Sequence, residues 1–346
     1  MIAKLRCWST TRKKQRCSGS AINENFTFGA CSVMLSLGIA TTILCNVSLI
    51  YGQGPPITDL AFSPDGKLLV CCSQRGLQVF SWPALKLQKT IEVSSANLRC
   101  LAFSLEGTRL ALGGGDPAVD GVVEVFSWPT LQPQMKLSGH DDSVSALVWQ
   151  GDSKLVSASL DRNLIYWDLE SQEAIRTLRG HSRAVRAACF LSQNELVTAG
   201  SDHSVRVWNV DTGELLRSLN QHSKPVSAMQ MRPLSIGLPM VATAAGDRSI
   251  RFWQPTIGRM MRYIRLDSKP LDIAWIDEAR IVASCVDGGL RVIDSDNVSV
   301  LQTIPALQEW AYAIAVHPTD ATLAIGGSNG LIRRLQLPAL DAATKE

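Results

Sequence analysis

A set of four residues that recurs three times between residues 140 and 253 constrains the fold most strongly. Each set has a His, a Ser or Thr, an Asp and a Trp: His140, Ser157, Asp161 and Trp167; His181, Thr198, Asp202 and Trp208; His222, Thr243, Asp247 and Trp253. All four positions advance by 41 residues from the first set to the second, and by 41 (the His) or 45 from the second to the third. Because the extra residues fall in one loop and the register is kept on both sides, the segment is a true repeat.

A period near 41 residues indicates one supersecondary unit per repeat. Each copy contains short runs in which side chains alternate with a period of two, as at Val144, Ala146 and Val148, and this period is typical of strands. A small antiparallel sheet of such strands is marginal alone. Stacking its copies in a closed ring buries the apolar faces and leaves only short edges. The repeat therefore predicts an all-β fold.

The strings "SGH…SLDRNLIYWD" (138–168) and "RGH…GSDHSVRVWN" (179–209) resemble WD40 repeats. The resemblance implies a propeller of four-stranded antiparallel blades in which each four-residue set shares one buried hydrogen-bonded network. Such a network supplies the partners that buried indole, hydroxyl and imidazole groups need. A catalytic Ser–His–Asp interpretation is the alternative, but a set that recurs at every well-formed blade is not expected of an active site.

Seven units can be followed by the residue at the third-strand Trp position, which is Phe80, Phe126, Trp167, Trp208, Trp253, Ile293 or Leu335. We therefore predict a seven-bladed propeller over residues 55–340, followed by a tail at 341–346. The last unit ends soon after its third strand, and WD propellers usually take the missing strand from the N-terminal end; residues 46–51 fit this role. Blades one, two, six and seven lack the complete set, which predicts that they depend on apolar packing.

The N-terminal region has two parts. Residues 1–28 form a basic, polar leader, and residues 29–51 contain no charged side chain over 23 positions, which is long enough to span a bilayer. Three interpretations are open: a membrane anchor with its basic end inside, an export signal cleaved near residues 38–40, or a start codon assigned too early. The first two, typical of a bacterial-type protein, place the propeller outside the cytoplasm, and the third leaves it in the cytoplasm.

Charge and cysteine content exclude several function classes. The first 53 residues hold six of the 34 basic and one of the 31 acidic residues, so the ring carries 28 basic and 30 acidic residues and gives no argument for nucleic-acid binding. Five cysteines lie on predicted apolar strands: Cys71, Cys72, Cys100, Cys189 and Cys285. No cysteine or histidine spacing matches a metal or haem site, so we predict no cofactor.

Function is therefore expected to reside in surfaces. We predict a non-catalytic scaffold that binds protein partners, with the N-terminal segment as its only membrane contact. Loops on one face of the ring carry a basic set opposed by Asp142, and this set is predicted to receive an acidic peptide or protein: Arg162, Arg183, His203, Lys224 and Arg248. The alternative is an enzyme or ligand-binding protein whose site lies in the central channel, where the innermost strands offer Asp59, Asp272 and His317.

Overall fold

The computed structural model describes residues 49–50, 54–95, 97–233 and 237–337. The chain divides into two units, Met1–Leu44 and Cys45–Glu346, and every described residue belongs to the second. The predictions for the leader, for residues 29–48 and for the tail lie outside the described residues. Within the described part of the chain, no helix has both the length and the apolar character needed to cross a bilayer.

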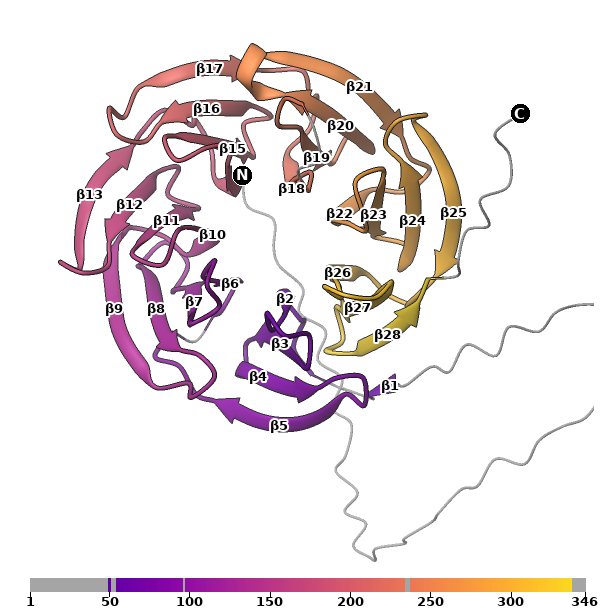
Figure 1. The fold of residues 1–346 in the computed structure, drawn as a ribbon, viewed down its shortest axis with the longest axis horizontal. Coiled ribbons are helices and arrows are strands. Elements are labelled where there is room, and N and C mark those ends of the chain that lie inside the picture. Colours follow the sequence, from indigo (N-terminus) through magenta and orange to yellow (C-terminus); the bar gives the residue numbers. More distant parts are fainter. Residues whose placement is uncertain (1–48, 51–53, 96, 234–236, 338–346) are drawn as a thin grey trace, which may run out of the picture. The chain divides into compact units, whose positions relative to one another are not determined.

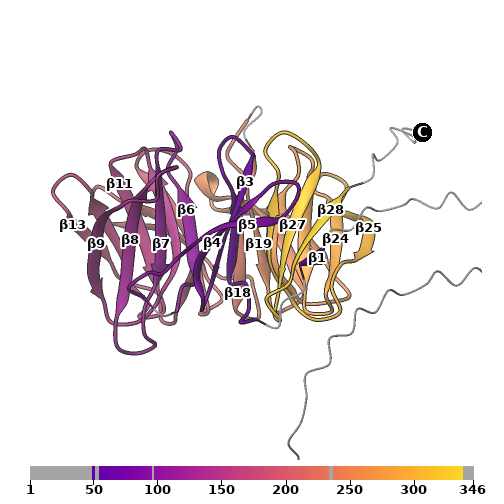
Figure 2. The ribbon, with the colours of Figure 1, turned by 90° about the horizontal axis from the view of Figure 1, so that it is seen from below.

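The described residues form seven four-stranded antiparallel sheets arranged around a central axis (Figure 1). Seen from the side, the strands of each sheet run between the two faces of the ring (Figure 2). The predicted all-β, seven-bladed propeller is therefore confirmed.

Six blades each use four consecutive strands. Blades one to three contain β2 (Asp59–Phe62), β3 (Leu68–Ser73), β4 (Gly76–Ser81) and β5 (Lys86–Ile91); β6 (Cys100–Phe103), β7 (Arg109–Gly114), β8 (Gly121–Ser127) and β9 (Pro133–His140); and β10 (Val144–Gln150), β11 (Lys154–Ser159), β12 (Leu164–Asp168) and β13 (Glu173–Leu178). Blades four to six contain β14 (Val185–Phe190), β15 (Glu195–Gly200), β16 (Val205–Asn209) and β17 (Leu215–Leu219); β18 (Val226–Met231), β19 (Val241–Ala245), β20 (Ser249–Gln254) and β21 (Arg259–Arg265); and β22 (Pro270–Trp275), β23 (Arg280–Cys285), β24 (Gly289–Asp294) and β25 (Ser299–Pro305). A short 3₁₀ helix, η1 (Pro255–Ile257), precedes β21.

Blade seven joins the two ends of the ring. Its strands are β26 (Ala311–Val316), β27 (Thr322–Gly327), β28 (Ile332–Gln336) and β1 (Leu49–Ile50). Leu49 pairs with Arg333, and Ile50 pairs with Ile332. Backbone pairing therefore closes the ring; the other residues of the 46–51 prediction lie outside the described part of the chain.

The third-strand position keeps one register through blades with different side chains. Trp208 lies opposite Leu196, and Ile293, which has no polar side chain, lies opposite Ile281 in the same way. All four of these side chains are buried. The aliphatic residues of the later blades thus fill the position that the tryptophans fill in blades three to five.

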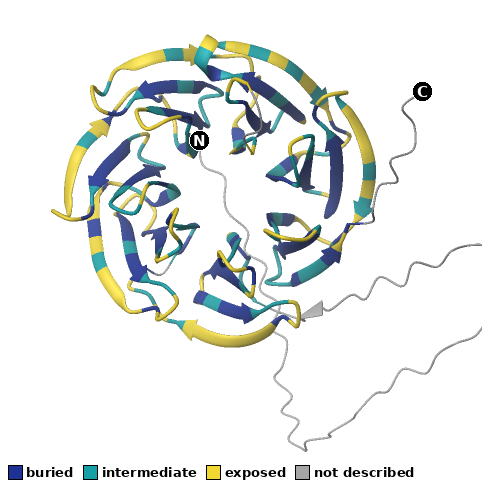
Figure 3. Cartoon of the chain, viewed as in Figure 1, coloured by how far each residue is buried: buried dark blue, intermediate teal, exposed yellow. Residues whose placement is uncertain are grey.

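The apolar core lies between neighbouring blades. Each of seven apolar clusters of described residues combines side chains from two adjacent sheets; one of them packs Val156 and Leu164 of blade three against Trp208 of blade four. The outermost strands are largely exposed and the inner strands are buried (Figure 3). A blade therefore needs both neighbours to complete its core, as expected of a repeat architecture.

Candidate functional site

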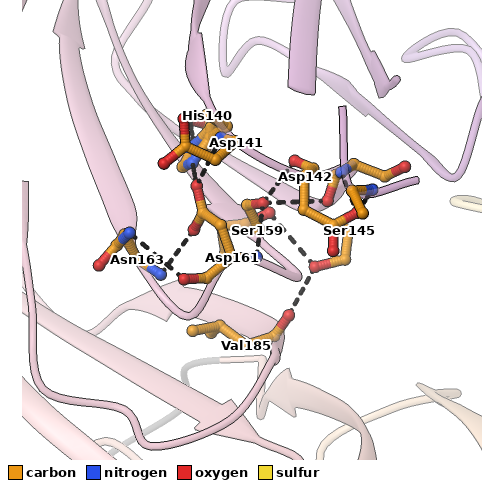
Figure 4. A network of polar contacts seen from close by, with 12 residues as sticks. His140, Asp141, Asp142, Ser145, Ser159, Asp161, Asn163 and Val185 are labelled. Carbon is orange, nitrogen blue, oxygen red and sulfur yellow. Dashed lines mark hydrogen bonds and ion pairs between the residues drawn. The ribbon is translucent and has the colours of Figure 1, made fainter. Parts of the chain in front are cut away.

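The four-residue sets of blades three to five form equivalent hydrogen-bonded networks, called tetrads below. In blade four, His181 lies between Asp202 and Thr198, with Nδ1 2.9 Å from the carboxylate and Nε2 2.8 Å from Thr198 Oγ1. The Trp208 indole N–H donates to the same hydroxyl at 2.9 Å. The corresponding distances in blades three and five are 2.8–3.0 Å. Figure 4 shows the blade-three His140 and Asp161 side chains in contact.

The partners assign the protons within each tetrad. A carboxylate beside Nδ1 accepts the imidazole N–H, which leaves Nε2 as the acceptor for the Ser or Thr hydroxyl. That hydroxyl then accepts the indole N–H, so every polar group in the network has a partner. Burial lowers the pKa of His222, against the effect of Asp247, and this favours the neutral imidazole that the scheme requires.

The tetrad aspartates join each incoming loop to the turn between the second and third strands. The Asp202 carboxylate accepts the Ser182 backbone N–H at 3.0 Å and the Ser204 backbone N–H at 3.2 Å. Burial opposes ionisation, but hydrogen bonds from His222 and Ser249 hold the pKa of Asp247 at about 2. These carboxylates are therefore ionised at neutral pH. We call the surface formed by these loops and turns the tetrad face.

The tetrads have the order of a Ser–His–Asp catalytic site but not its accessibility. The side chains of Ser157, Thr198 and Thr243 are all 0% exposed, and each accepts an indole N–H. A nucleophile must reach a substrate within hydrogen-bonding distance of its base. The geometry therefore supports a structural role for the three tetrads.

Blade six, which was predicted to depend on apolar packing, has apolar clusters on both sides and also an ion-pair cluster at the tetrad positions. Asp267 stands at the His position and Asp287 at the tetrad Asp position. Arg291, whose side chain is 4% exposed, contacts both carboxylates, at 2.8 and 2.6 Å. The sequence carried a signal: an Arg four residues after the turn Asp also occurs in blades four and five, where Arg206 and Arg251 lie near Asp202 and Asp247.

Replacing Arg291 with Met is expected to lower the free energy of unfolding by about 1–2 kcal/mol, measured by urea denaturation. Two charge-assisted contacts are lost, but Asp267 and Asp287 are 71% and 43% exposed and recover hydration. Arg162→Met, at an exposed turn position, is the matched control and is expected to cost no more than about 0.5 kcal/mol. Equal stability losses in the two variants would refute the proposed role of the cluster.

The five residues predicted to bind a partner lie in the loops and turns of the tetrad face. Arg162, His203 and Arg248 each follow a tetrad Asp and have φ angles of 78°, 69° and 63°. Arg183 and Lys224 each lie two residues after a tetrad His. All are exposed except His203, which is half-buried. None of them forms an ion pair with a described residue.

Asp142, predicted to oppose this basic set, is occupied by a neighbouring loop. Its carboxylate accepts the backbone N–H groups of Ala118, at 3.0 Å, and of Ser143, at 2.7 Å. The loop that contains Ala118 connects the second and third strands of blade two. Asp142 therefore anchors this loop to blade three.

The channel candidates have structural contacts. Asp59 and Asp272 accept the backbone N–H groups of Leu101 and Ile314, each in the following blade, at 2.8 and 3.0 Å. They therefore link blade one to two and blade six to seven. The prediction that His317 lies on an innermost strand is wrong: β26 ends at Val316, and the His317 Nε2 lies 3.0 Å from the Gly66 carbonyl oxygen in the hairpin of blade one.

The cysteines of the ring are free thiols. Cys71, Cys72, Cys100 and Cys285 are buried and Cys189 is partly buried. Burial raises the pKa of the Cys189 thiol to about 12, which makes the reactive thiolate rare at neutral pH. Among the described residues, no group of three or more His, Cys, Asp or Glu side chains is arranged to hold a metal ion.

The fold and the tetrads define a class: a seven-bladed β-propeller in which blades three to five each contain a buried hydrogen-bonded network of His, Ser or Thr, Asp and Trp. A family model described as "WD domain, G-beta repeat" matches residues 45–81, 131–168, 172–209 and 213–254. The last three of these segments each contain one tetrad, so the tetrad blades are WD40 repeats.

Curated relatives share only part of their length with this chain. The chain is 30% identical to UBP9-binding protein bun62 of Schizosaccharomyces pombe over 33% of its own length and 21% of the relative. It is 30% identical to WD repeat-containing protein 1 of Bos taurus over 38% of its length and 22% of the relative. A guanine nucleotide-binding protein subunit beta of Arabidopsis thaliana is 29% identical over 39% of this chain and 37% of the relative. The chain thus spans about a fifth of the first two relatives.

Proposed function

We propose that this protein is a non-catalytic interaction scaffold that binds an acidic peptide or protein segment on its tetrad face. The observation that carries the proposal is the placement of the basic residues at repeated positions. In blades three to five each tetrad fixes a turn, and the next residue (Arg162, His203 or Arg248) has a left-handed conformation at that face. The buried networks thereby hold the backbone of these external residues in a fixed conformation, which reduces the backbone entropy lost on binding.

Electrostatics favour an acidic partner. Arg183 and Lys224 lie in the loops beside these turns, and no ion pair with a described residue neutralises them. Exposed charges contribute modestly to affinity and more strongly to association rate and specificity. The name of the bun62 relative describes it as a binding protein, which agrees with a scaffold function in this family.

The double variant Arg183→Glu and Arg248→Glu is expected to weaken binding of a fluorescent hexa-aspartate peptide by about tenfold. The peptide serves as a defined acidic probe, and its affinity is measured by fluorescence anisotropy at low and physiological salt. Binding to the unaltered protein is expected to fall as salt rises.

The control is Lys86→Glu with Lys89→Glu, which makes the same charge change on the exposed outer strand β5. This control is expected to retain most of the affinity. The proposal fails when both double variants lose equal affinity, because the probe then responds only to net charge. It also fails when neither variant changes binding.

A further inference from the structure

One position of each innermost strand borders the central channel at the tetrad face. In five blades a β-bulge occurs there, at Ser145, Arg186, Ser227, Leu271 and Tyr312. A bulge bends the strand and redirects a side chain. In blades one and two the same position is held by Thr58 and Arg99, directly before the first strand. We call these seven residues the channel mouth. Six of them, with Pro56, line a cavity of about 380 Å³.

The small hydroxyls of the channel mouth are used for contacts between blades. The Thr58 hydroxyl donates to the Leu98 carbonyl oxygen at 2.9 Å, and the Ser227 hydroxyl donates to the Pro270 carbonyl oxygen at 3.1 Å. Ser145 makes the same contact with Val185, which Figure 4 shows as a bridge between neighbouring blades. A ligand in the cavity therefore meets mainly the remaining polar groups, which are two guanidinium groups and the Tyr312 hydroxyl.

Arg99 and Arg186, from blades two and four, line this cavity without an acidic partner. The Arg99 Nε is buried and has no hydrogen-bond partner among the described residues. Arg186 donates to the Ser201 hydroxyl at 3.3 Å, and neither guanidinium forms an ion pair with a described carboxylate. Burial, followed by the positive charge of Arg99, lowers the pKa of Arg186. Arg99 is partly buried and Arg186 is exposed, and their like charges repel each other across the cavity unless an anion lies between them.

We infer that the channel mouth binds an oxyanion, a carboxylate or a phosphate group, between the guanidinium groups of Arg99 and Arg186. Planar guanidinium groups donate paired hydrogen bonds to such anions. The site differs from the basic set proposed above, because it lies inside the channel and contains none of those five residues.

The nearby carboxylates do not fill this role. Asp142 raises the pKa of Arg186, but its carboxylate is held by the backbone N–H groups of Ala118 and Ser143. Asp59 and Asp272 line a cavity of about 260 Å³ that Arg99 and Arg186 also line, but neither carboxyl group forms an ion pair with these arginines, and both oxygens of each carboxyl accept backbone N–H groups. Burial raises the pKa of Asp59 to about 7, which reduces the negative charge near the site.

The size of the cavity favours an oxyanion that belongs to a larger ligand. A volume of 380 Å³ accommodates on the order of ten water molecules, more than a free phosphate displaces. Trp310, 50% exposed, lies beside Tyr312 with their ring centroids 5.7 Å apart. This aromatic pair provides an apolar contact next to the charged site. A free anion and an acidic or phosphorylated protein side chain share the required chemistry.

The test is a calorimetric titration of the full chain with inorganic phosphate and, separately, with a short phosphoserine peptide. Saturable binding of at least one probe is expected. Arg99→Gln and Arg186→Gln are each expected to weaken it about tenfold or more, since a hydrogen bond to a charged group contributes about 1.5–3 kcal/mol. Arg162→Gln removes one positive charge from the same face and is expected to leave the affinity within about twofold.

The outcomes separate the two sources of the anion. Tighter binding of the peptide supports a protein side chain, and equal affinity of peptide and phosphate supports a free anion. Arg186→Lys, which keeps the charge, should retain part of the affinity, and unchanged melting temperatures show that the variants are folded. Absence of saturable binding, or equal binding by Arg99→Gln, Arg186→Gln and the unaltered chain, overturns the inference. Neither result depends on the hexa-aspartate experiment.

Discussion

Replacing Trp208 with Ala is expected to lower the free energy of unfolding by about 3–5 kcal/mol. The side chain is 1% exposed and packs between blades three and four. Its removal leaves a cavity between the blades, because each blade is held by its two neighbours and cannot move in to fill the space. It also leaves the Thr198 hydroxyl without the indole N–H that it accepts at 2.9 Å.

The loss is measured by urea denaturation, with Trp310→Ala as the control. Trp310 is 50% exposed, so its removal is expected to cost only about 1 kcal/mol or less. Thr198→Val tests the polar part of the effect, since it keeps the volume but removes the hydroxyl shared by His181 and Trp208. A Trp208→Ala loss no greater than that of Trp310→Ala would show that the tetrad position does not stabilise the ring.

The architecture was predictable because it is repeated. A fixed spacing of His, Asp and Trp positions reveals the size of the structural unit, and the aliphatic side chain of Ile293 can be assigned to the same place by counting from Trp253. The observed pairing of Ile293 with Ile281 confirms that assignment. Repetition therefore allows the fold to be predicted from the sequence even in blades whose polar residues have changed.

Contacts of side chains that depart from the repeated set were not predictable in the same way. In the Asp267–Arg291–Asp287 cluster of blade six, Asp287 keeps the tetrad Asp position, but an Asp replaces the tetrad His, 24 positions before Arg291, and pairs with the guanidinium group. The channel mouth depends on β-bulges, which redirect side chains such as Arg186 without any mark in the apolar pattern. The sequence likewise offered Asp59 and Asp272 only as candidates for the alternative of a site in the central channel, whereas each accepts a backbone N–H from the next blade.

The burial of these two carboxyl groups makes the stability of the ring dependent on pH. Burial raises the pKa of Asp59 to about 7, against the opposing hydrogen bond from Leu101, and burial raises that of Asp272 to about 6. A carboxyl with a raised pKa in the folded state takes up a proton on folding. Its stabilising contribution is complete below the unfolded pKa, near 3.8, and is lost as the pH rises through the folded value.

Replacing Asp59 with Asn is therefore expected to reduce the loss of stability between pH 5 and pH 8. The unaltered protein should lose about 2–3 kcal/mol relative to Asp59→Asn over this range, because one unit of pKa shift corresponds to about 1.4 kcal/mol. At pH 5 the variant should be the less stable of the two, since an amide cannot accept both the Leu60 and Leu101 N–H groups as the carboxyl does. Urea denaturation at both pH values measures the difference, and Asp211→Asn, at an exposed position, should follow the unaltered protein. Parallel stability curves for Asp59→Asn and the unaltered chain would show that Asp59 does not take up a proton on folding, and that the contact between blades one and two is held by an ionised carboxylate throughout.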